Sequence, residues 1–144
     1  MIIIVDIDGT VSRVGDRVKY LSEKPVNWDA FYDACFEDEP IIPIIRLVHL
    51  LAKDYEIVFL TGRRESVRDI TVKWLNNYFH NREYHLLMRP NGDHRHDTEI
   101  KPELLRKANI SLRSIELIIE DRNSMVKKWR ELGLTCLQPA EGDF

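Results

Sequence analysis

Apolar and polar positions fall into blocks along this chain, and the apolar blocks have the length of strands. Met1–Val5 is a continuous, largely β-branched run, typical of a central strand buried on both faces. Glu56–Leu60, Glu83–Met88 and Ile115–Ile119 predict three more strands, and Leu134–Leu137 predicts a short last one. The predicted strands are therefore spread over the whole chain.

Apolar residues at helical spacing fill most of the intervals between these strands. Strands that alternate with helices predict an α/β domain with a parallel sheet and right-handed crossovers. Only residues 11–40 break this rhythm, and we expect them to form an insertion over the carboxyl edge of the sheet. The expected helices are Asn27–Phe36 with Asn27 as its cap, Pro43 to about Lys53, a long amphipathic helix carrying Val67, Ile70, Trp74 and Tyr78, a short helix from Pro102 to Ala108, and Ser124–Leu132 before Gly133.

The composition limits the classes of function. A chain of 144 residues suggests one domain, and a net charge of −3 provides no global positive field to attract nucleic acid. A nucleic-acid role therefore needs a local basic patch, for which residues 89–107 are the candidate. The apolar runs are far shorter than the roughly 20 residues that a bilayer requires, and no signal peptide is visible. The two cysteines lack metal-ligand spacing, so we expect reduced thiols in a cytoplasmic protein.

Residues that can carry chemistry follow four of the predicted strands. In an open parallel sheet the carboxyl ends of the strands meet at one edge, and ligands bind there. The residues in question are far apart in sequence, but this geometry would bring them to one crevice. They are Asp6 and Asp8, Thr61 and Arg63, Arg89, and Glu120 with Asp121.

The string Ile-Val-Asp-Ile-Asp-Gly-Thr at residues 4–10 is the sharpest signal. Asp-Gly alone is a common turn pair. Here, however, two aspartates one residue apart follow a buried strand, and both can face a pocket if the chain leaves extended geometry at Ile7. Gly9 permits such a departure. One carboxylate can then act as a nucleophile while the other moves protons.

This string resembles the signature of the haloacid dehalogenase-like (HAD) phosphatase superfamily. The resemblance implies a Rossmann-like fold, with helices on both faces of a central parallel sheet and a small helical cap insertion. It also implies that Asp6 is the nucleophile that forms an aspartyl-phosphate, and that Asp8 is the general acid/base. Thr61, Gly62 and Arg63 match the loop that binds the transferring phosphate.

The same resemblance assigns charge compensation to a lysine and to a metal ion. Lys101 matches the lysine that neutralises phosphate and nucleophile, and Glu120-Asp121 matches the acidic metal motif. Anionic groups around one phosphoryl group repel each other, and a divalent cation resolves that conflict. Oxygen-only ligands and a phosphate substrate favour Mg²⁺. The implied ligands are Asp6, the backbone carbonyl of Asp8, and Asp121, with Glu120 in support.

Residues 84–144 are further similar to the 3′-phosphatase domains of phage polynucleotide kinases. This likeness implies that Arg17, Arg63, Arg89 and Asp97 lie around the substrate phosphate and Lys101. The chain departs from the family at Glu120, where aspartate is frequent, and over residues 18–40. The stretches that carry the likeness are Met88-Arg89, Gly92-Asp93-x-Arg95, Asp97, Lys101, Ile119 to Arg122, Val126-x-x-Trp129-Arg130-x-x-Gly133 and Gly142-Asp143-Phe144.

We therefore expect a Mg²⁺-dependent phosphomonoesterase for nucleotide phosphates, with a 3′-phosphate at a nucleic-acid end as the first candidate substrate. A nucleotidase for free nucleoside monophosphates, a non-catalytic phosphate-binding module and another HAD reaction remain as alternatives. The insertion bears on this choice, because a closed cap excludes polymer ends. Its aromatic residues either stack on a base or belong to the core, and they are Trp28, Phe31 and Tyr32.

Other expectations concern partners and stability. The chain contains no Gly-x-x-x-x-Gly-Lys-Ser/Thr loop, so we expect a free-standing phosphatase without a kinase half. We expect no membrane partner, a location in the cytoplasm (the host cytoplasm for a phage protein), and no ligand role for the His94 and His96 pair. The oligomeric state is left open. Since the site clusters like charges, we expect the Asp8→Asn substitution to stabilise the metal-free fold.

Overall fold

A computed structural model describes residues 1–144 and contains a five-stranded parallel sheet in the order β5-β4-β1-β6-β7. β1 occupies the centre, paired with β4 on one side and β6 on the other. This confirms the predicted parallel α/β architecture. The strands are β1 (Ile2–Val5), β4 (Glu56–Arg64), β5 (His85–Arg89), β6 (Ile115–Ile119) and β7 (Cys136–Leu137).

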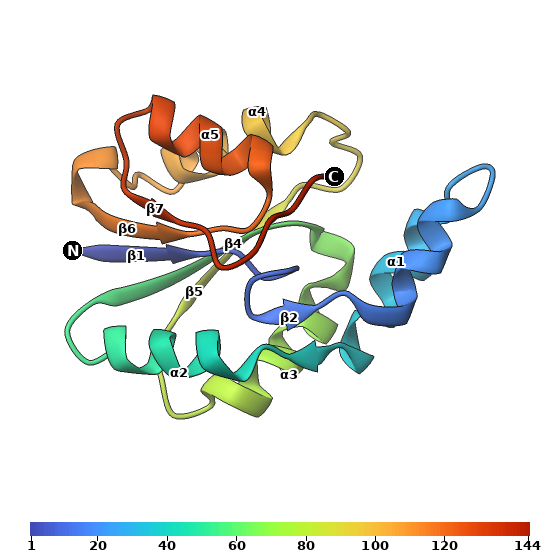
Figure 1. Ribbon diagram of the computed structural model, residues 1–144, viewed down its shortest axis with the longest axis horizontal. Helices are drawn as coiled ribbons and strands as arrows, with labels where there is room; N and C mark the ends of the chain where they lie inside the picture. Colours follow the sequence, from blue (N-terminus) through green and yellow to red (C-terminus); the bar gives the residue numbers. More distant parts are fainter.

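Helices cover both faces of the sheet (Figure 1). α2 (Ile42–Leu51) and α3 (Arg68–Phe79) pack on one face, while α4 (Asp97–Lys107) and α5 (Asn123–Glu131) pack on the other. No helix is both long and apolar enough to cross a membrane. Short 3₁₀ turns precede α3 and β6, at Glu65–Val67 and Leu112–Ser114.

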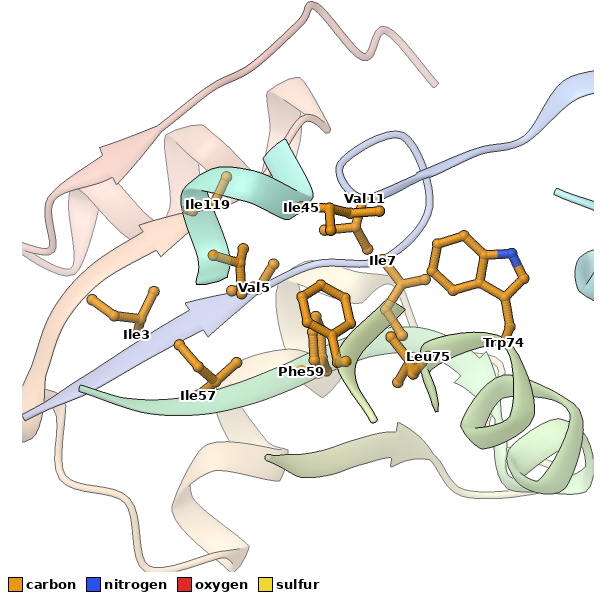
Figure 2. Packing of buried hydrophobic residues seen from close by; sticks show 12 residues of the cluster. Ile3, Val5, Ile7, Val11, Ile45, Ile57, Phe59, Trp74, Leu75 and Ile119 are labelled. Atoms are coloured by element: carbon orange, nitrogen blue, oxygen red, sulfur yellow. The ribbon is translucent and has the colours of Figure 1, made fainter. Parts of the chain in front are cut away.

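The central strand builds a separate core on each of its two faces. Ile3 and Val5 point into a cluster that also contains Phe59 and Trp74, whereas Ile4 points into the opposite cluster. Successive side chains of a strand face opposite sides, so a continuous apolar run is what a sheet covered on both faces requires. Figure 2 shows the first cluster, in which Phe59 and Trp74 join the β1 side chains Ile3 and Val5.

Residues 12–40 lie beyond the carboxyl ends of the strands, on the side away from the N-terminus (Figure 1). Their two ends pair as a small antiparallel ladder, β2 (Ser12–Arg13) with β3 (Glu39–Pro40). Between them lie the 3₁₀ helix η1 (Gly15–Ser22), α1 (Trp28–Asp33) and the 3₁₀ turn η2 (Ala34–Glu37). We call residues 11–40 the insertion.

The predicted capping roles of Asn27 and Gly133 are both confirmed. The Asn27 side chain accepts a hydrogen bond from the Ala30 amide at 3.1 Å, which caps the start of α1. α1 ends at Asp33, however, and the chain tightens into a 3₁₀ turn before Phe36. α5 is followed by Gly133 with a φ of +81°, the left-handed conformation that ends many helices.

α4 begins five residues earlier than the sequence predicts. Pro102 lies inside this helix and not at its start. The His96 side chain accepts a hydrogen bond from the Thr98 amide at 3.2 Å and so caps the helix ahead of the proline. Burial of Ile100 and Leu104 against the sheet holds the helix together although the proline has no amide to donate. Lys101 therefore belongs to the second turn of α4.

Candidate active site

The loop after β1 turns tightly around one carbonyl group. The Ile7 carbonyl accepts hydrogen bonds from the amides of Thr10, Val11 and Ser12 at 3.0–3.2 Å. Gly9 has a φ of +82°, and a methyl group at its Cα would overlap the Asp121 carboxylate. Glycine is therefore required here both for the backbone conformation and for the close approach of Asp121, which follows the neighbouring strand β6.

Three carboxylates and one lysine form the buried centre of the site. Carboxylate oxygens of Asp6, Glu120 and Asp121 lie within 4.8 Å of one another, and all three residues are buried. The Lys101 Nζ donates to Asp6 Oδ1 at 2.8 Å and to Glu120 Oε2 at 2.7 Å. One ammonium group thus faces three carboxyl groups, which leaves an excess of negative charge.

Burial and this excess of negative charge raise the pKa of two of the acids. Burial, and then the charge of Glu120, raise the pKa of Asp6 to about 7, although Lys101 opposes the shift. Burial, and then the charge of Asp6, raise the pKa of Asp121 to about 7. For Lys101 burial acts in the opposite direction, but the charges of Asp6 and Glu120 outweigh it and hold its pKa above the usual range.

The donor set fits a hard divalent cation. Both Glu120 oxygens are engaged by protein donors, one by Lys101 and the other by the Arg122 amide at 3.2 Å. Asp121 accepts a hydrogen bond only at Oδ1, from the Thr10 hydroxyl at 3.1 Å. Asp121 and Asp6 therefore keep free oxygens for a metal ion, whereas Glu120 is placed to support them. Clustered carboxylates are a donor set that Mg²⁺ accepts.

Asp8 has a different environment from Asp6. Arg63 donates to both of its oxygens, with Nε 3.0 Å from Oδ2 and Nη2 2.7 Å from Oδ1, and Arg17 also pairs with Oδ1. Burial works against ionisation, but the two guanidinium groups hold the pKa of Asp8 well below its usual range. The expectation that Asp8→Asn stabilises the fold does not fit these contacts, because the substitution weakens a compensated ion pair.

A residue of the insertion, Asp38, completes this charge cluster. Its two oxygens accept from Arg17 Nε and Nη2, both at 2.8 Å, and from the Ser12 hydroxyl at 2.6 Å. Asp38 and Asp8 together balance the charges of Arg17 and Arg63. No local sequence pattern separates Asp38 from its exposed acidic neighbours Glu37 and Glu39.

Arg89 and Asp97 tie the loops of the site together. Arg89 donates to the carbonyl oxygens of Gly62, Asp93 and Arg95 at 2.6–3.2 Å and pairs with Asp97. Asp97 also accepts from Arg122 at 2.9 Å, and it forms no hydrogen bond to Lys101. A methyl group on Gly62 would lie 2.8 Å from the Asp97 carboxylate, so this contact depends on glycine.

All predicted site residues except Arg17 and Asp121 line one cavity of about 630 Å³. Arg17 and Asp121 lie directly behind it, in contact with Asp8 and Thr10. Thr61 is buried, and its hydroxyl accepts from the Arg63 amide at 3.2 Å. Trp28, Phe31 and Tyr32, for which the sequence left stacking and core roles open, also line this cavity, as does Arg95 of the candidate basic patch. The lining residues to which sequence reasoning assigned no role in the site are Val14, Val18, Leu21, Arg64, Asp93, His94, His96, Arg122 and Phe144.

The predicted basic patch at residues 89–107 is not a free cationic surface. Arg89 and Lys101 are buried in ion pairs. Arg95 pairs with Asp93 at 2.7 Å and with Glu103 at 2.6 Å. Lys107 pairs with Glu103 as well, so Arg106 is the one exposed cation of this stretch without an ion pair. The sequence counts cations along the chain, while the fold brings acidic side chains against most of them.

Comparison with known proteins shows the family. The whole chain, residues 1–144, matches the family described as the polynucleotide kinase PNKP phosphatase domain. A protein of Autographa californica nuclear polyhedrosis virus, described as a bifunctional polynucleotide kinase/RNA ligase, is 28% identical over 132 residues, covering 90% of this chain and 18% of that protein. In the solved Pnkp1/Rnl/Hen1 RNA repair complex, one chain superposes with a TM-score of 0.83 at 32% identity, over 99% of this chain and 43% of that one.

A more distant neighbour shares the fold alone. A haloacid dehalogenase-like hydrolase from Streptococcus pneumoniae superposes with a TM-score of 0.66 at 16% identity, over 95% of this chain and 83% of that one. The chain spans less than half the length of the viral protein and of the repair-complex chain. With the family match over its full length, the chain belongs to the polynucleotide kinase PNKP phosphatase domain family and is a HAD-type phosphatase.

Proposed function

We propose that this protein is a Mg²⁺-dependent phosphomonoesterase that removes the 3′-phosphate from a nucleic-acid end through an aspartyl-phosphate. The single observation that carries the chemistry is the contrast between two neighbouring carboxyl groups. Asp6 lies in a charge-rich, buried centre with Lys101, while Asp8 is paired with arginines in the same cavity. Environments that differ this much divide nucleophile and proton carrier between two residues.

In the first half-reaction a carboxylate oxygen of Asp6 attacks phosphorus. The new Asp6–phosphorus bond forms as the bond from phosphorus to the 3′-oxygen breaks, and a proton from Asp8 converts the leaving oxygen to an alcohol. Lys101, which already contacts Asp6, stays beside the transferring group and offsets its negative charge.

The second half-reaction restores the enzyme. Asp8, now a carboxylate, takes a proton from water, and the resulting oxygen attacks phosphorus. The bond between phosphorus and Asp6 breaks, so that inorganic phosphate leaves, Asp6 is again a carboxylate and Asp8 is protonated for the next turnover. The two steps together consume one water molecule.

This sequence requires Asp8 to be protonated, although in the substrate-free protein two arginines keep it ionised. A phosphate group offers oxygens that suit the planar fork of arginine. We therefore assign Arg17 and Arg63 to the bound phosphate: when substrate binds, they give up their ion pairs with Asp8 and pair with the phosphate instead. The loss of their positive charge raises the pKa of Asp8 and prepares it to act as an acid.

The residues that would hold Mg²⁺ are Asp6, Asp121 and the backbone carbonyl of Asp8, with Glu120 in support. When bound, the ion supplies positive charge to the carboxylates and to the phosphate oxygens. Thr10 orients Asp121 by its hydrogen bond, and Lys101 together with the Arg122 amide orients Glu120. These protein contacts fix the oxygen donors before the ion arrives.

The identity of the substrate rests on the relatives and on the cavity. The viral relative is described as a polynucleotide kinase/RNA ligase, and the structural neighbour belongs to an RNA repair complex. In this chain the insertion forms one wall of the cavity, so we propose that it acts as the cap that sets substrate size. A wall of this kind also accommodates a free nucleoside monophosphate, which makes a nucleotidase the second candidate.

The test compares phosphate release in Mg²⁺ from an oligonucleotide with a 3′-phosphate, the same oligonucleotide with a 5′-phosphate, and free nucleoside 3′- and 5′-monophosphates. We expect the 3′-phosphorylated oligonucleotide to react with the highest kcat/KM. A preference for free monophosphates would assign the protein to the nucleotidases instead. Asp6→Asn should abolish turnover, whereas Asp54→Asn, at an exposed loop position, is the matched control.

A further inference from the structure

The helix α1 presents an open aromatic face to the active-site cavity. Trp28 is 44% exposed and stacks against Tyr32, with ring centroids 6.1 Å apart and an angle of 23° between the planes. Phe31 lies beside them and makes edge contact with both rings. All three rings line the cavity, but Phe31 is only 8% exposed, so Trp28 and Tyr32 present the open part of this face.

The aromatic face is continuous with the catalytic centre. The same cavity is lined by Asp6 and Asp8, by Trp28, and by Val18 of η1. Val18 is 54% exposed, so the part of the lining that the insertion supplies includes an open apolar surface. An apolar, aromatic wall next to a highly charged phosphate site fits a ligand with a flat apolar part attached to a phosphate.

Positive charge accompanies the aromatic rings. The Arg64 guanidinium lies over the Tyr32 ring at 5.5 Å, and its ion pair is with Asp29 at 3.4 Å, a side chain that is 92% exposed. Such an exposed pair is weak and leaves Arg64 free to meet an anion. Arg122 stacks on the Phe144 ring at 4.7 Å on another part of the cavity lining. Aromatic faces with adjacent arginines are the combination by which proteins hold single-stranded nucleic acid.

The aromatic face is fixed relative to the phosphate site. The Tyr32 hydroxyl lies 3.5 Å from the Gly62 carbonyl, to which it donates, and Gly62 lies near the end of β4 beside Thr61 and Arg63. Arg17 donates to the Phe31 carbonyl at 3.3 Å, and its guanidinium lies 4.4 Å from the centre of the Phe31 ring. These contacts anchor the aromatic face to the residues that we assign to the phosphate.

From this arrangement we propose that Trp28 and Tyr32 form the stacking platform for the nucleobase of the nucleotide that carries the 3′-phosphate. The proposal rests on the proposed function and names the subsite for the base. Stacking needs an unpaired base, so the platform selects single-stranded 3′ ends over blunt duplex ends. It recognises the flat face of a base and not its edges, so the enzyme accepts all four bases with similar efficiency.

The experiment uses two single-stranded oligonucleotides with a 3′-phosphate that differ only in their last nucleotide, which is normal in one and abasic in the other. The measured quantity is the ratio of kcat/KM for the normal substrate to kcat/KM for the abasic substrate. Trp28→Ala should lower this ratio about 5- to 150-fold, because base stacking contributes about 1–3 kcal/mol. Trp28→Phe, which keeps an aromatic ring, should retain most of the ratio, and the losses should fall mainly on KM.

Phe36→Ala is the matched control. Phe36 lies in the same insertion, is 44% exposed like Trp28, and does not line the cavity. It should leave the ratio unchanged. An equal ratio in Trp28→Ala and in the wild type would overturn the platform while leaving the 3′-phosphatase activity in place. If the wild type hydrolyses p-nitrophenyl phosphate but neither oligonucleotide, both the proposed substrate and the platform are wrong.

Discussion

Replacing Lys101 by methionine tests whether its ammonium group holds the acidic centre together. Methionine keeps most of the length and apolar volume of the side chain but removes its charge. Lys101 is 2% exposed and bridges Asp6 and Glu120 at 2.8 and 2.7 Å. Removing one partner of such a buried pair costs about 3–5 kcal/mol, because the remaining charges are uncompensated. For a domain of this size that corresponds to a fall in Tm of roughly 10–15 °C.

The assay is thermal unfolding followed by circular dichroism, with a chelator present, at pH 8 and at pH 5. The loss should be largest at pH 8, where the carboxyl groups ionise, and smaller at pH 5, where protonation removes the repulsion. Lys107→Met is the control, since Lys107 lies on the same helix and pairs with Glu103 at the surface. An exposed pair contributes at most about 1 kcal/mol. If Lys101→Met melts within 2 °C of Lys107→Met at pH 8, the ammonium does not compensate the acidic centre.

Further predictions follow from the same electrostatics. The pKa of Asp6 and that of Asp121 are raised to about 7, so the folded protein holds these two protons more tightly than the unfolded chain does. The resulting stabilisation is complete below about pH 4 and is lost as the pH rises to 7, so the Tm of the metal-free protein should fall between pH 5 and pH 8. Saturating Mg²⁺ should remove this pH dependence of the Tm. Asp121→Asn should raise the Tm of the metal-free protein at pH 8 by several degrees, whereas Asp8→Asn should lower it. Melting curves in which Asp121→Asn lowers the Tm and Asp8→Asn raises it would contradict this account. Asp38→Ala should lower kcat/KM about 10- to 100-fold, since hydrogen bonds to charged groups contribute about 1.5–3 kcal/mol. Asp38→Asn, which can still accept hydrogen bonds, should recover part of the lost kcat/KM. An equal loss in both variants would mean that Asp38 does not act by positioning Arg17.

The predicted core of the fold and the centre of the site rest on local sequence signals. A continuous apolar run is sufficient to place β1 in the middle of a covered sheet, and the polar residues after it then have to lie at the carboxyl edge. The convergence of Asp6 with Asp121, 115 positions away, follows from the parallel arrangement of the strands, whose carboxyl ends meet at one edge, and needs no knowledge of side-chain contacts. The start of α4 was misplaced because proline is a frequent first residue of helices, and nothing local shows that burial of Ile100 extends the helix upstream.

The charge pairings were beyond the reach of sequence patterns. Asp38 meets Arg17 across 21 residues and Asp97 meets Arg122 across 25, through loops of irregular geometry. Whether an aspartate at such a position is solvated or buried depends on packing that only the folded chain defines. For the same reason the helical spacing in α1 did not reveal that Phe31 is buried while Trp28 remains open.

The insertion contributes more than a wall, and this bears on how related enzymes can diverge. Its Arg17 and Asp38 belong to the same ionic cluster as Asp8, and its Tyr32 contacts Gly62 of β4. A segment that shares ion pairs and hydrogen bonds with the scaffold in this way is not an interchangeable module. If the corresponding segment of a relative were transplanted into this scaffold, it would alter specificity only if it carried an arginine and a carboxylate at the positions of Arg17 and Asp38. Selection therefore has to act on the segment and the scaffold together.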